Sequence, residues 1–161
     1  AAVTSPLFAT IKQFHLLDTH WGVIVPLVAF NAPMMLLMIK NYFDGIPNEL
    51  LESARIDGAG SFRIWFQFMM PLSVPMLANV LVLTFIYAWN DYLVPLLLMR
   101  SEENYTVTLA AQYFMSSTYQ SPIDVARIYA VMILLALPSI LVYLCSQKFL
   151  VSGVTAGAVK G

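Results

Sequence analysis

Long uncharged runs of apolar residues, separated by short polar segments, dominate the sequence. Three runs are long enough to cross a membrane as helices, over residues 21–39, 73–99 and 128–150, because a spanning helix needs about 20 predominantly apolar residues. An apolar segment over residues 1–14 is too short to span, and we expect it to be the end of a truncated span. The pattern predicts an all-α membrane protein, folded as a multi-span helical bundle.

Two polar segments separate the predicted spans, one over residues 41–72 and one over residues 100–127. Lysine and arginine near the ends of spans favour the cytoplasmic side of a membrane. Five such residues fall on the side of the first segment and three on the other: Lys40, Arg55, Arg63, Lys148 and Lys160, against Lys12, Arg100 and Arg127. We therefore expect residues 41–72 and the C-terminus in the cytoplasm, and residues 100–127 as an external loop.

Composition supports a membrane location and excludes several functions. Hydrophobic residues make up 60% of the chain and charged residues 11%, whereas soluble domains have about a quarter of their residues charged. The net charge is −1 and no basic cluster occurs, which excludes nucleic acid as a partner because nucleic-acid binding needs a basic surface. The single cysteine, Cys145, can form neither an internal disulfide nor a cysteine metal site.

The sequence also lacks the residue patterns of an enzyme. No nucleophile is accompanied by a base, so we expect a protein without catalytic residues. The glycines around Gly58 lack the lysine of a phosphate-binding loop, so the chain cannot bind ATP by that mechanism. His15 and His20 flank Asp18 but no further ligands follow at metal-site spacing, which indicates a polar outer loop. We expect no metal and no cofactor.

The segment over residues 41–72 predicts two short helices joined by glycines. Pro47 suits the first turn of the first helix, and residues 58–60 end it. A second helix over residues 62–70 carries aromatic side chains suited to a membrane interface, and Pro71 stops it. Leucine and small residues share one face of the first helix, which suits close contact with another protein. An ordinary amphipathic helix on the membrane surface explains the pattern equally well.

A gapless motif in this loop distinguishes the two alternatives. The segment resembles the EAA loop of ATP-binding-cassette (ABC) importer permeases, whose pattern is Glu-Ala-Ala, three residues, Gly, nine residues, Ile, one residue, Leu-Pro. The matching positions here are Glu52, Ser53, Ala54, Gly58, Phe68, Met70 and Pro71. The carbohydrate branch of these permeases is similar in four further segments: HLLDTHWG at 15–22, ARIDGA at 54–59, WNDYLVPLLL at 89–98 and VSGVTAGAVKG at 151–161.

The resemblance implies a permease subunit that moves a sugar or oligosaccharide into the cytoplasm of a bacterial or archaeal cell, across the inner membrane. It implies a cytoplasmic coupling helix that docks on a separate ATPase dimer through Glu52, Ser53, Ala54, Arg55, Asp57, Gly58 and Ala59. A second permease, identical or different, and an extracytoplasmic sugar-binding protein are the other implied partners, besides membrane lipid. The alternatives are an ion-coupled secondary transporter and an ABC permease for a non-sugar solute.

Two further sets of residues are candidates for contacts during transport. Trp89, Asn90, Asp91 and Tyr92 could line a substrate path, because ionisable residues inside a membrane are costly; an interfacial aromatic belt is the alternative. Gln112, Tyr113 and Tyr119 could contact the binding protein, unless residues 100–127 are simply a solvated loop. The same resemblance implies that the tail at 151–161 extends toward the ATPase interface. A frayed terminus is the alternative.

Overall fold

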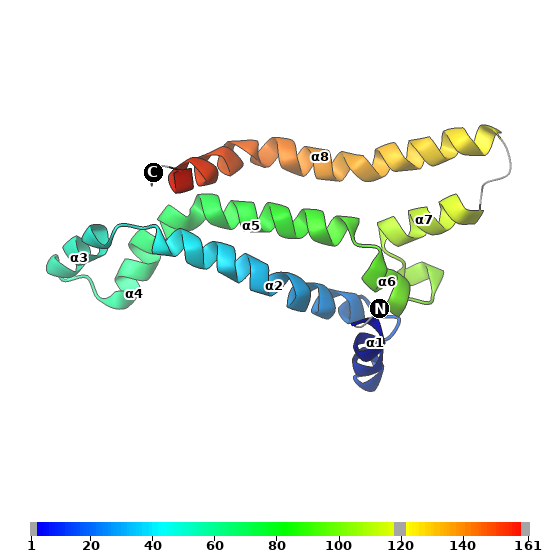
Figure 1. Ribbon diagram of the computed structural model, residues 1–161, viewed down its shortest axis with the longest axis horizontal. Helices are drawn as coiled ribbons and strands as arrows, with labels where there is room; N and C mark the ends of the chain where they lie inside the picture. Colours follow the sequence, from blue (N-terminus) through cyan, green and yellow to red (C-terminus); the bar gives the residue numbers. More distant parts are fainter. Residues whose placement is uncertain (1–2, 118–121, 159–161) are drawn as a thin grey trace. The chain divides into compact units, whose positions relative to one another are not determined.

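Helices and their connecting loops account for the whole of the chain that the computed structural model describes, residues 3–117 and 122–158, with no strand among them (Figure 1). The predicted all-α fold class is therefore confirmed. In chain order the helices are α1 (Thr4–Gln13), α2 (His20–Asp44), α3 (Asn48–Ile56), α4 (Ser61–Ile64), the π-helical turn η1 (Trp65–Met69), α5 (Met70–Asn90), α6 (Leu93–Leu98), the 3-10 turn η2 (Glu102–Asn104), α7 (Val107–Ser117) and α8 (Pro122–Ala158).

Three helical segments among the described residues are long and apolar enough to cross a membrane: His20–Asp44, Ser61–Asn90 and Val125–Gln147. Side chains on these segments are largely exposed, as with Leu36 at 64%, Leu81 at 70% and Leu134 at 63%. Exposed apolar surface of this extent is unfavourable in water but matches the hydrocarbon of a bilayer, where lipid tails are as apolar as leucine. The long helices are therefore suited to lipid and to neighbouring spans.

The second long helix begins earlier than the sequence predicted. We expected Pro71 to end a separate interfacial helix, but α4, η1 and α5 follow one another without a break across it. The backbone N–H of Met70 donates to the carbonyl of Trp65, five residues earlier, as in a π turn. Proline has no N–H and its ring crowds the carbonyl four residues before it. The wider π turn relieves this crowding, so the helix continues.

The same helix ends earlier than predicted. A single span was expected over residues 73–99, but α5 ends at Asn90 and α6 begins at Leu93. The Oδ2 atom of Asp91 accepts a hydrogen bond of 3.2 Å from the backbone N–H of Val94, in the first turn of α6. Asparagine and aspartate compete in this way with the helical backbone bonds, and therefore favour helix ends over helix interiors.

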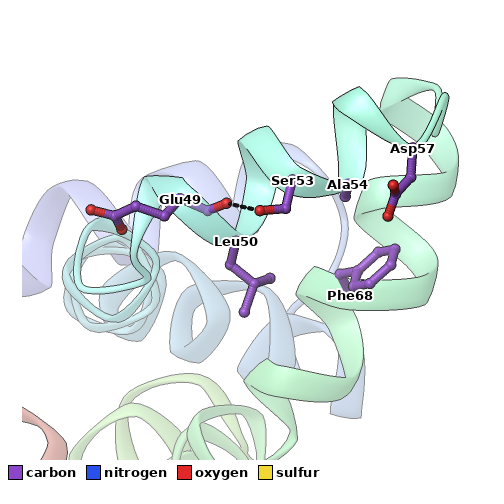
Figure 2. A pocket seen from close by; sticks show the side chains of 6 residues that line it. All are labelled: Glu49, Leu50, Ser53, Ala54, Asp57 and Phe68. Carbon is purple, nitrogen blue, oxygen red and sulfur yellow. Dashed lines mark hydrogen bonds between the residues drawn. The ribbon is translucent and has the colours of Figure 1, made fainter.

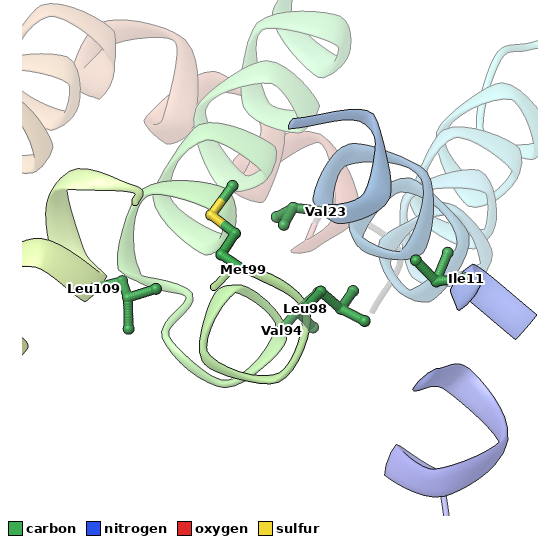
Figure 3. Close-up of a cluster of buried hydrophobic side chains, with 6 residues drawn as sticks. All are labelled: Ile11, Val23, Val94, Leu98, Met99 and Leu109. Atoms are coloured by element: carbon green, nitrogen blue, oxygen red, sulfur yellow. The ribbon is translucent and has the colours of Figure 1, made fainter. Parts of the chain in front are cut away.

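The described residues fold as two compact units, which we treat separately. Unit 1 takes its residues from 1–32 and 85–141, and unit 2 from 33–84 and 142–161. The apolar core of unit 1 consists of Ile11, Val23, Val94, Leu98, Met99 and Leu109 (Figure 3). Leu98 is 1% exposed, and α1 packs against α6 beside it. This core joins α1 and α2 to α6 and α7, which come much later in the sequence.

Gly22 sits where the loop before α2 approaches that helix most closely. Its N–H donates to the hydroxyl of Thr19 at 3.1 Å, and the Thr19 hydroxyl donates in turn to the Leu16 carbonyl at 2.7 Å. A Cβ atom built on Gly22 would lie 2.1 Å from the Leu16 carbonyl oxygen. No side chain of any size fits without a shift of the backbone.

Gly22→Ala is therefore expected to destabilise unit 1 by about 1–3 kcal/mol, the usual cost of forcing extra atoms into a packed site. The measurement is the thermal unfolding midpoint of the full-length protein in detergent. Gly60→Ala is the matched control, because a Cβ at Gly60 meets nothing within 4 Å. Equal midpoints for the two variants would contradict the close approach at Gly22.

Candidate functional site

The loop helix α3 has the local signals of a short stable helix. Pro47 is its N-cap residue, Glu49 lies in its first turn and Arg55 in its last. Both charges complement the helix dipole, which favours acids at the N-terminus and bases at the C-terminus. The hydroxyl of Ser53 donates to the Glu49 carbonyl at 2.7 Å. These local interactions therefore stabilise α3 as a short helix that begins after Pro47.

The end of α3 is a Schellman motif. Gly58 has a φ of +77°, in the left-handed region that glycine adopts without steric cost. The N–H of Ala59 donates to the Ala54 carbonyl and the N–H of Gly58 to the Arg55 carbonyl, both at 3.0 Å. This pair of bonds satisfies carbonyls that the helix end would leave free. The motif reverses the chain sharply toward α4.

Because of this reversal, α3 faces the π-helical turn η1 across a groove of about 410 Å³ (Figure 2). The lining residues are Glu49, Leu50, Ser53, Ala54, Asp57 and Phe68. Leu50 and Phe68 point into the groove from its two sides, and Ala54 is 4% exposed between them. The carboxylates of Glu49 and Asp57 lie at its ends. The groove thus has an apolar floor and an acidic rim.

The predicted docking residues divide between this groove and the opposite surface of α3. Ser53, Ala54 and Asp57 line the groove, whereas Glu52, Arg55 and Gly58 are exposed outside it and Ala59 is half-buried. Leu50 belongs to the leucine face that the sequence predicted for close protein contact and Phe68 to the motif, but neither they nor Glu49 were among the predicted docking residues. The i, i+4 spacing of Leu50 and Ala54 was a usable signal for one wall. Phe68 comes from a separate helix, so only the tertiary structure brings it in.

Two large apolar side chains stand out from the loop beside the glycine turn. Ile56, at the end of α3, is 86% exposed, and Phe62, at the start of α4, is 84% exposed. Together with the groove they form a candidate docking surface, which we define as α3, the turn at 57–60, Phe62 and Phe68 and call the docking surface below. Neighbouring exposed apolar residues with charged residues around them are typical of a protein or membrane contact.

The residues predicted to line a substrate path lie at the break between α5 and α6. Trp89 is half-buried, and its indole N–H donates to the Leu135 carbonyl of α8 at 3.0 Å. Asn90 is the last residue of α5, and Asp91 accepts the hydrogen bond at the start of α6. Tyr92 is 36% exposed. These four consecutive residues therefore lie at one helix break in unit 1, and they differ in exposure and in hydrogen-bond partners.

Asp18 has a role that sequence reasoning missed. Its carboxylate accepts hydrogen bonds from the backbone N–H groups of Arg100 at 2.9 Å and Ser101 at 3.0 Å, and another from the Ser101 hydroxyl. Its own N–H donates to the Leu98 carbonyl at 2.9 Å, and its carbonyl accepts from the Asn104 amide at 2.8 Å. Asp18 thus ties the loop between α1 and α2 to the loop after α6.

These hydrogen bonds also lower the pKa of Asp18. The Ser101 hydroxyl is the largest cause, followed by the backbone N–H groups of Ser101 and Arg100. All three donate to the charged form of the carboxylate, and so hold its pKa well below the ordinary range. A positive φ of 59° at Asp18, which aspartate tolerates better than most residues, allows the loop to present the carboxylate.

Two of the three candidate binding-protein contacts lie on α7. Gln112 and Tyr113 are exposed on this helix, and the Tyr113 ring meets the ring of Tyr105 edge to face at 6.0 Å. Tyr119 lies outside the described residues. The loop predicted over residues 100–127 is therefore largely helical, since it contains η2, α7 and the beginning of α8.

Comparison with known proteins identifies the class of protein that this fold and loop define. Residues 2–156 match the family of the binding-protein-dependent transport system inner membrane component, and the chain belongs to that family. The maltodextrin transport system permease protein MdxG of Bacillus subtilis is 37% identical over 163 residues, which cover 97% of this chain and 58% of MdxG. The predicted resemblance to importer permeases is therefore confirmed.

Two other relatives and one solved structure agree with this assignment. The arabinooligosaccharides transport system permease protein AraQ of Bacillus subtilis is 35% identical over 159 residues, covering 97% of this chain and 54% of AraQ. The sn-glycerol-3-phosphate transport system permease protein UgpE of Yersinia pestis is 38% identical over 148 residues, covering 92% and 52%. A bacterial ABC transporter involved in the import of the acidic polysaccharide alginate has a chain similar in structure, with a TM-score of 0.70, 26% identity and coverage of 89% and 54%.

The chain thus spans about half the length of the relatives that it matches. The family consists of transporter permease subunits and not of enzymes, and it belongs to the inner membrane. The residues of this chain that match the family include the docking surface, the junction between α5 and α6, and Asp18.

The lowered pKa of Asp18 predicts a pH-dependent stability. A carboxylate with a lowered folded-state pKa stabilises the fold above its unfolded pKa of about 3.9, and this stability is lost as the pH falls through that value toward the folded-state pKa. Asp18→Asn, which cannot ionise, should have a lower unfolding midpoint than wild type at pH 7. The difference should shrink as the pH falls below about 4. Thermal unfolding of the full-length protein in detergent at several pH values measures it.

Asp57→Asn is the control, because its carboxylate is exposed on the docking surface. A constant difference between wild type and Asp18→Asn at every pH would contradict the assignment.

Proposed function

We propose that this chain is the translocating part of an ABC importer permease for a sugar or oligosaccharide, coupled through its docking surface to a separate ATPase dimer. The single observation that carries the proposal is the docking surface itself, built on a gapless EAA-type motif. The names of two relatives support a carbohydrate as the solute, since they refer to maltodextrin and arabinooligosaccharides.

Charge and shape on the docking surface favour a partner with basic and apolar side chains. Glu52 is exposed on α3, and Glu49 and Asp57 flank the apolar floor of the groove. A carboxylate paired with an arginine forms two parallel charge-assisted hydrogen bonds, which fix orientation as well as adding binding energy. Ile56 and Phe62 supply apolar area that the partner would bury. An ATPase subunit that docks here would present an arginine and an apolar cleft.

The loop is built so that movement of α3 reaches a membrane span. Beyond the Schellman turn, α4, η1 and α5 form continuous helix, so no flexible linker separates the docking surface from α5. The hydroxyl of Tyr42, near the end of α2, donates to the Leu72 carbonyl of α5 at 2.7 Å and ties the two ends of the loop together. ATP-driven closure of the ATPase pair would therefore pull on both helices, shifting the permease between two conformational states.

The remaining partners belong to the same proposal. A second permease, identical or different, would complete the path, and an extracytoplasmic binding protein would deliver the solute to the side of α7, where Gln112 and Tyr113 are exposed. This arrangement puts the docking surface and the C-terminus in the cytoplasm. ATP hydrolysis belongs to the ATPase chains.

One alternative has a specific observation in its favour. The relative UgpE is named for sn-glycerol-3-phosphate, so a polar solute other than a sugar fits an equally similar permease. An ion-coupled transporter fits less well, because the relatives are permeases of ABC systems and the EAA-type loop would have no partner. Uptake assays with a panel of sugars and glycerol phosphates separate the two solute classes.

Charge reversal at Glu52 tests the docking surface. Glu52→Lys should lower the amount of ATPase that copurifies with the full-length permease in detergent by about tenfold or more, since a buried charge pair at an interface is usually a major contributor to affinity. Glu103→Lys, an exposed acid in η2, is the matched control and should retain the ATPase. Wild-type copurification of the Glu52 variant would refute the docking surface as the ATPase site.

Removal of the Tyr42 hydroxyl tests transmission rather than docking. Tyr42→Phe loses the hydrogen bond to Leu72 while keeping the ring, so the ATPase should copurify normally. Transport per ATP hydrolysed in proteoliposomes should fall several-fold, because α2 and α5 would respond separately to α3. Tyr143→Phe, on α8 and 52% exposed, serves as the control. An unchanged transport-to-hydrolysis ratio would contradict this role for Tyr42.

A further inference from the structure

The last turn of α5 makes polar contacts with α8, about 50 residues further along the chain. The indole N–H of Trp89 donates to the Leu135 carbonyl at 3.0 Å, with a sequence separation of 46 residues. The amide of Asn90 lies 3.5 Å from the Ser139 hydroxyl oxygen, 49 residues away. These two bonds join successive residues of α5 to sites one helical turn apart on α8, so they fix both the distance and the rotation of one helix against the other.

The turn of α8 that receives these bonds is the one that Pro138 interrupts. Proline has no N–H, so the carbonyl of Leu134, four residues earlier, lacks its usual helical donor. A proline turn inside a membrane helix is tolerated where neighbouring helices satisfy the backbone around it. The indole N–H of Trp89 donates to the neighbouring carbonyl of the same turn, that of Leu135, and so holds α5 against this turn.

Polar groups at the end of α5 also have hydrogen-bond partners within the chain. The hydroxyl of Thr108, in α7, donates to the Trp89 carbonyl at 2.5 Å, at the helix end where carbonyls lack intrahelical partners. The Asn90 amide also donates to the Ile86 carbonyl at 2.8 Å. The Trp89 ring stacks on Phe85 at a centroid distance of 5.7 Å, which holds the indole in place. The side-chain N–H groups of Trp89 and Asn90 therefore both donate to groups of the chain itself.

We propose that Trp89 and Asn90 are positioning residues that fasten the α5–α6 break to the proline turn of α8, and that this junction stays closed throughout the transport cycle. A solute held by side-chain N–H groups needs free donors, and the side-chain N–H groups of Trp89 and Asn90 already donate to α8 and α5. The proposal replaces a substrate-path role for Trp89 and Asn90, and it rests on the proposed transport function only for its functional readout. Asp91 and Tyr92 stay candidates for the path.

Kinetics of the assembled transporter separate positioning from solute binding. Trp89→Phe keeps an aromatic ring on Phe85 but removes the donor to Leu135, and Asn90→Ala removes the contact with Ser139. Both should lower the maximal uptake rate several-fold and leave the KM for the solute unchanged. Tyr87→Phe is the control on the same helix, since Tyr87 is 53% exposed. A raised KM at an unchanged maximal rate would overturn the proposal, and so would wild-type kinetics in both variants.

Cross-linking tests the closed junction without relying on transport. Asn90→Cys and Ser139→Cys are combined with Cys145→Ser, which removes the chain's own exposed thiol, and a methanethiosulfonate reagent a few ångströms long is added. Rapid cross-linking, read as protection from a fluorescent maleimide, is expected in the resting transporter and during ATP hydrolysis alike. The cross-linked protein should take up solute at least as fast as the same double-cysteine variant before cross-linking. Asn90→Cys with Cys145→Ser and Ser139→Cys with Cys145→Ser are the single-cysteine controls.

The outcomes distinguish this proposal from the proposed function. No cross-link, or a cross-link that forms and stops uptake, would overturn the fixed junction. Cross-linking in the resting and ATP-hydrolysing states, with no uptake of any solute by the parent protein, would contradict the proposed function and leave the junction supported.

Discussion

The need to satisfy every backbone polar group without water is the constraint on which this structure depends. In hydrocarbon an unpaired N–H or C=O costs several kcal/mol, so the described chain is almost entirely helical. Two departures from a regular helix are accompanied by a specific compensation. The π turn before Pro71 accommodates the proline, and Asp91 accepts the N–H of Val94 at the α5–α6 break.

Packing inside the chain is secondary to this constraint. Only 6% of the most apolar stretch of the segment Val125–Gln147 is buried within the described chain, so its stability in a membrane comes from lipid and from neighbouring helices. The compact core of unit 1 joins short helices and helix ends around Leu98, where polar loops also meet. Asp18 anchors that region with hydrogen bonds to Arg100 and Ser101, two consecutive residues of the loop after α6 that are more than 80 residues away in sequence.

The two units support different parts of the proposed activity. Unit 2 contains the docking surface and the continuous helix that leads from it into α5, and its rigidity depends on the Schellman turn at Gly58 and on the bond between Tyr42 and Leu72. Unit 1 contains the junction at Trp89 and Asn90, the exposed face of α7 and the hydrogen bonds of Asp18 to the loop after α6. A transporter that couples ATP hydrolysis to solute movement needs stiff elements at both places, because a flexible connection would dissipate the displacement.

The sequence by itself determined the helical membrane class, the approximate position of the long apolar helices and the EAA-type loop with its glycine turn. These depend on local composition and on short spacings, which do not require knowledge of distant contacts. The sequence wrongly predicted that a helix ends before Pro71, because a π turn lets the helix continue through the proline. It also wrongly predicted that the next helix runs past Asn90, because a side-chain hydrogen bond at Asp91 ends it within the apolar run. Only the tertiary structure brought Phe68 opposite Leu50, Ser101 to Asp18 and Trp89 to Leu135. Each of these contacts joins residues from different helices or loops, and no local pattern encodes which distant partner a side chain will meet.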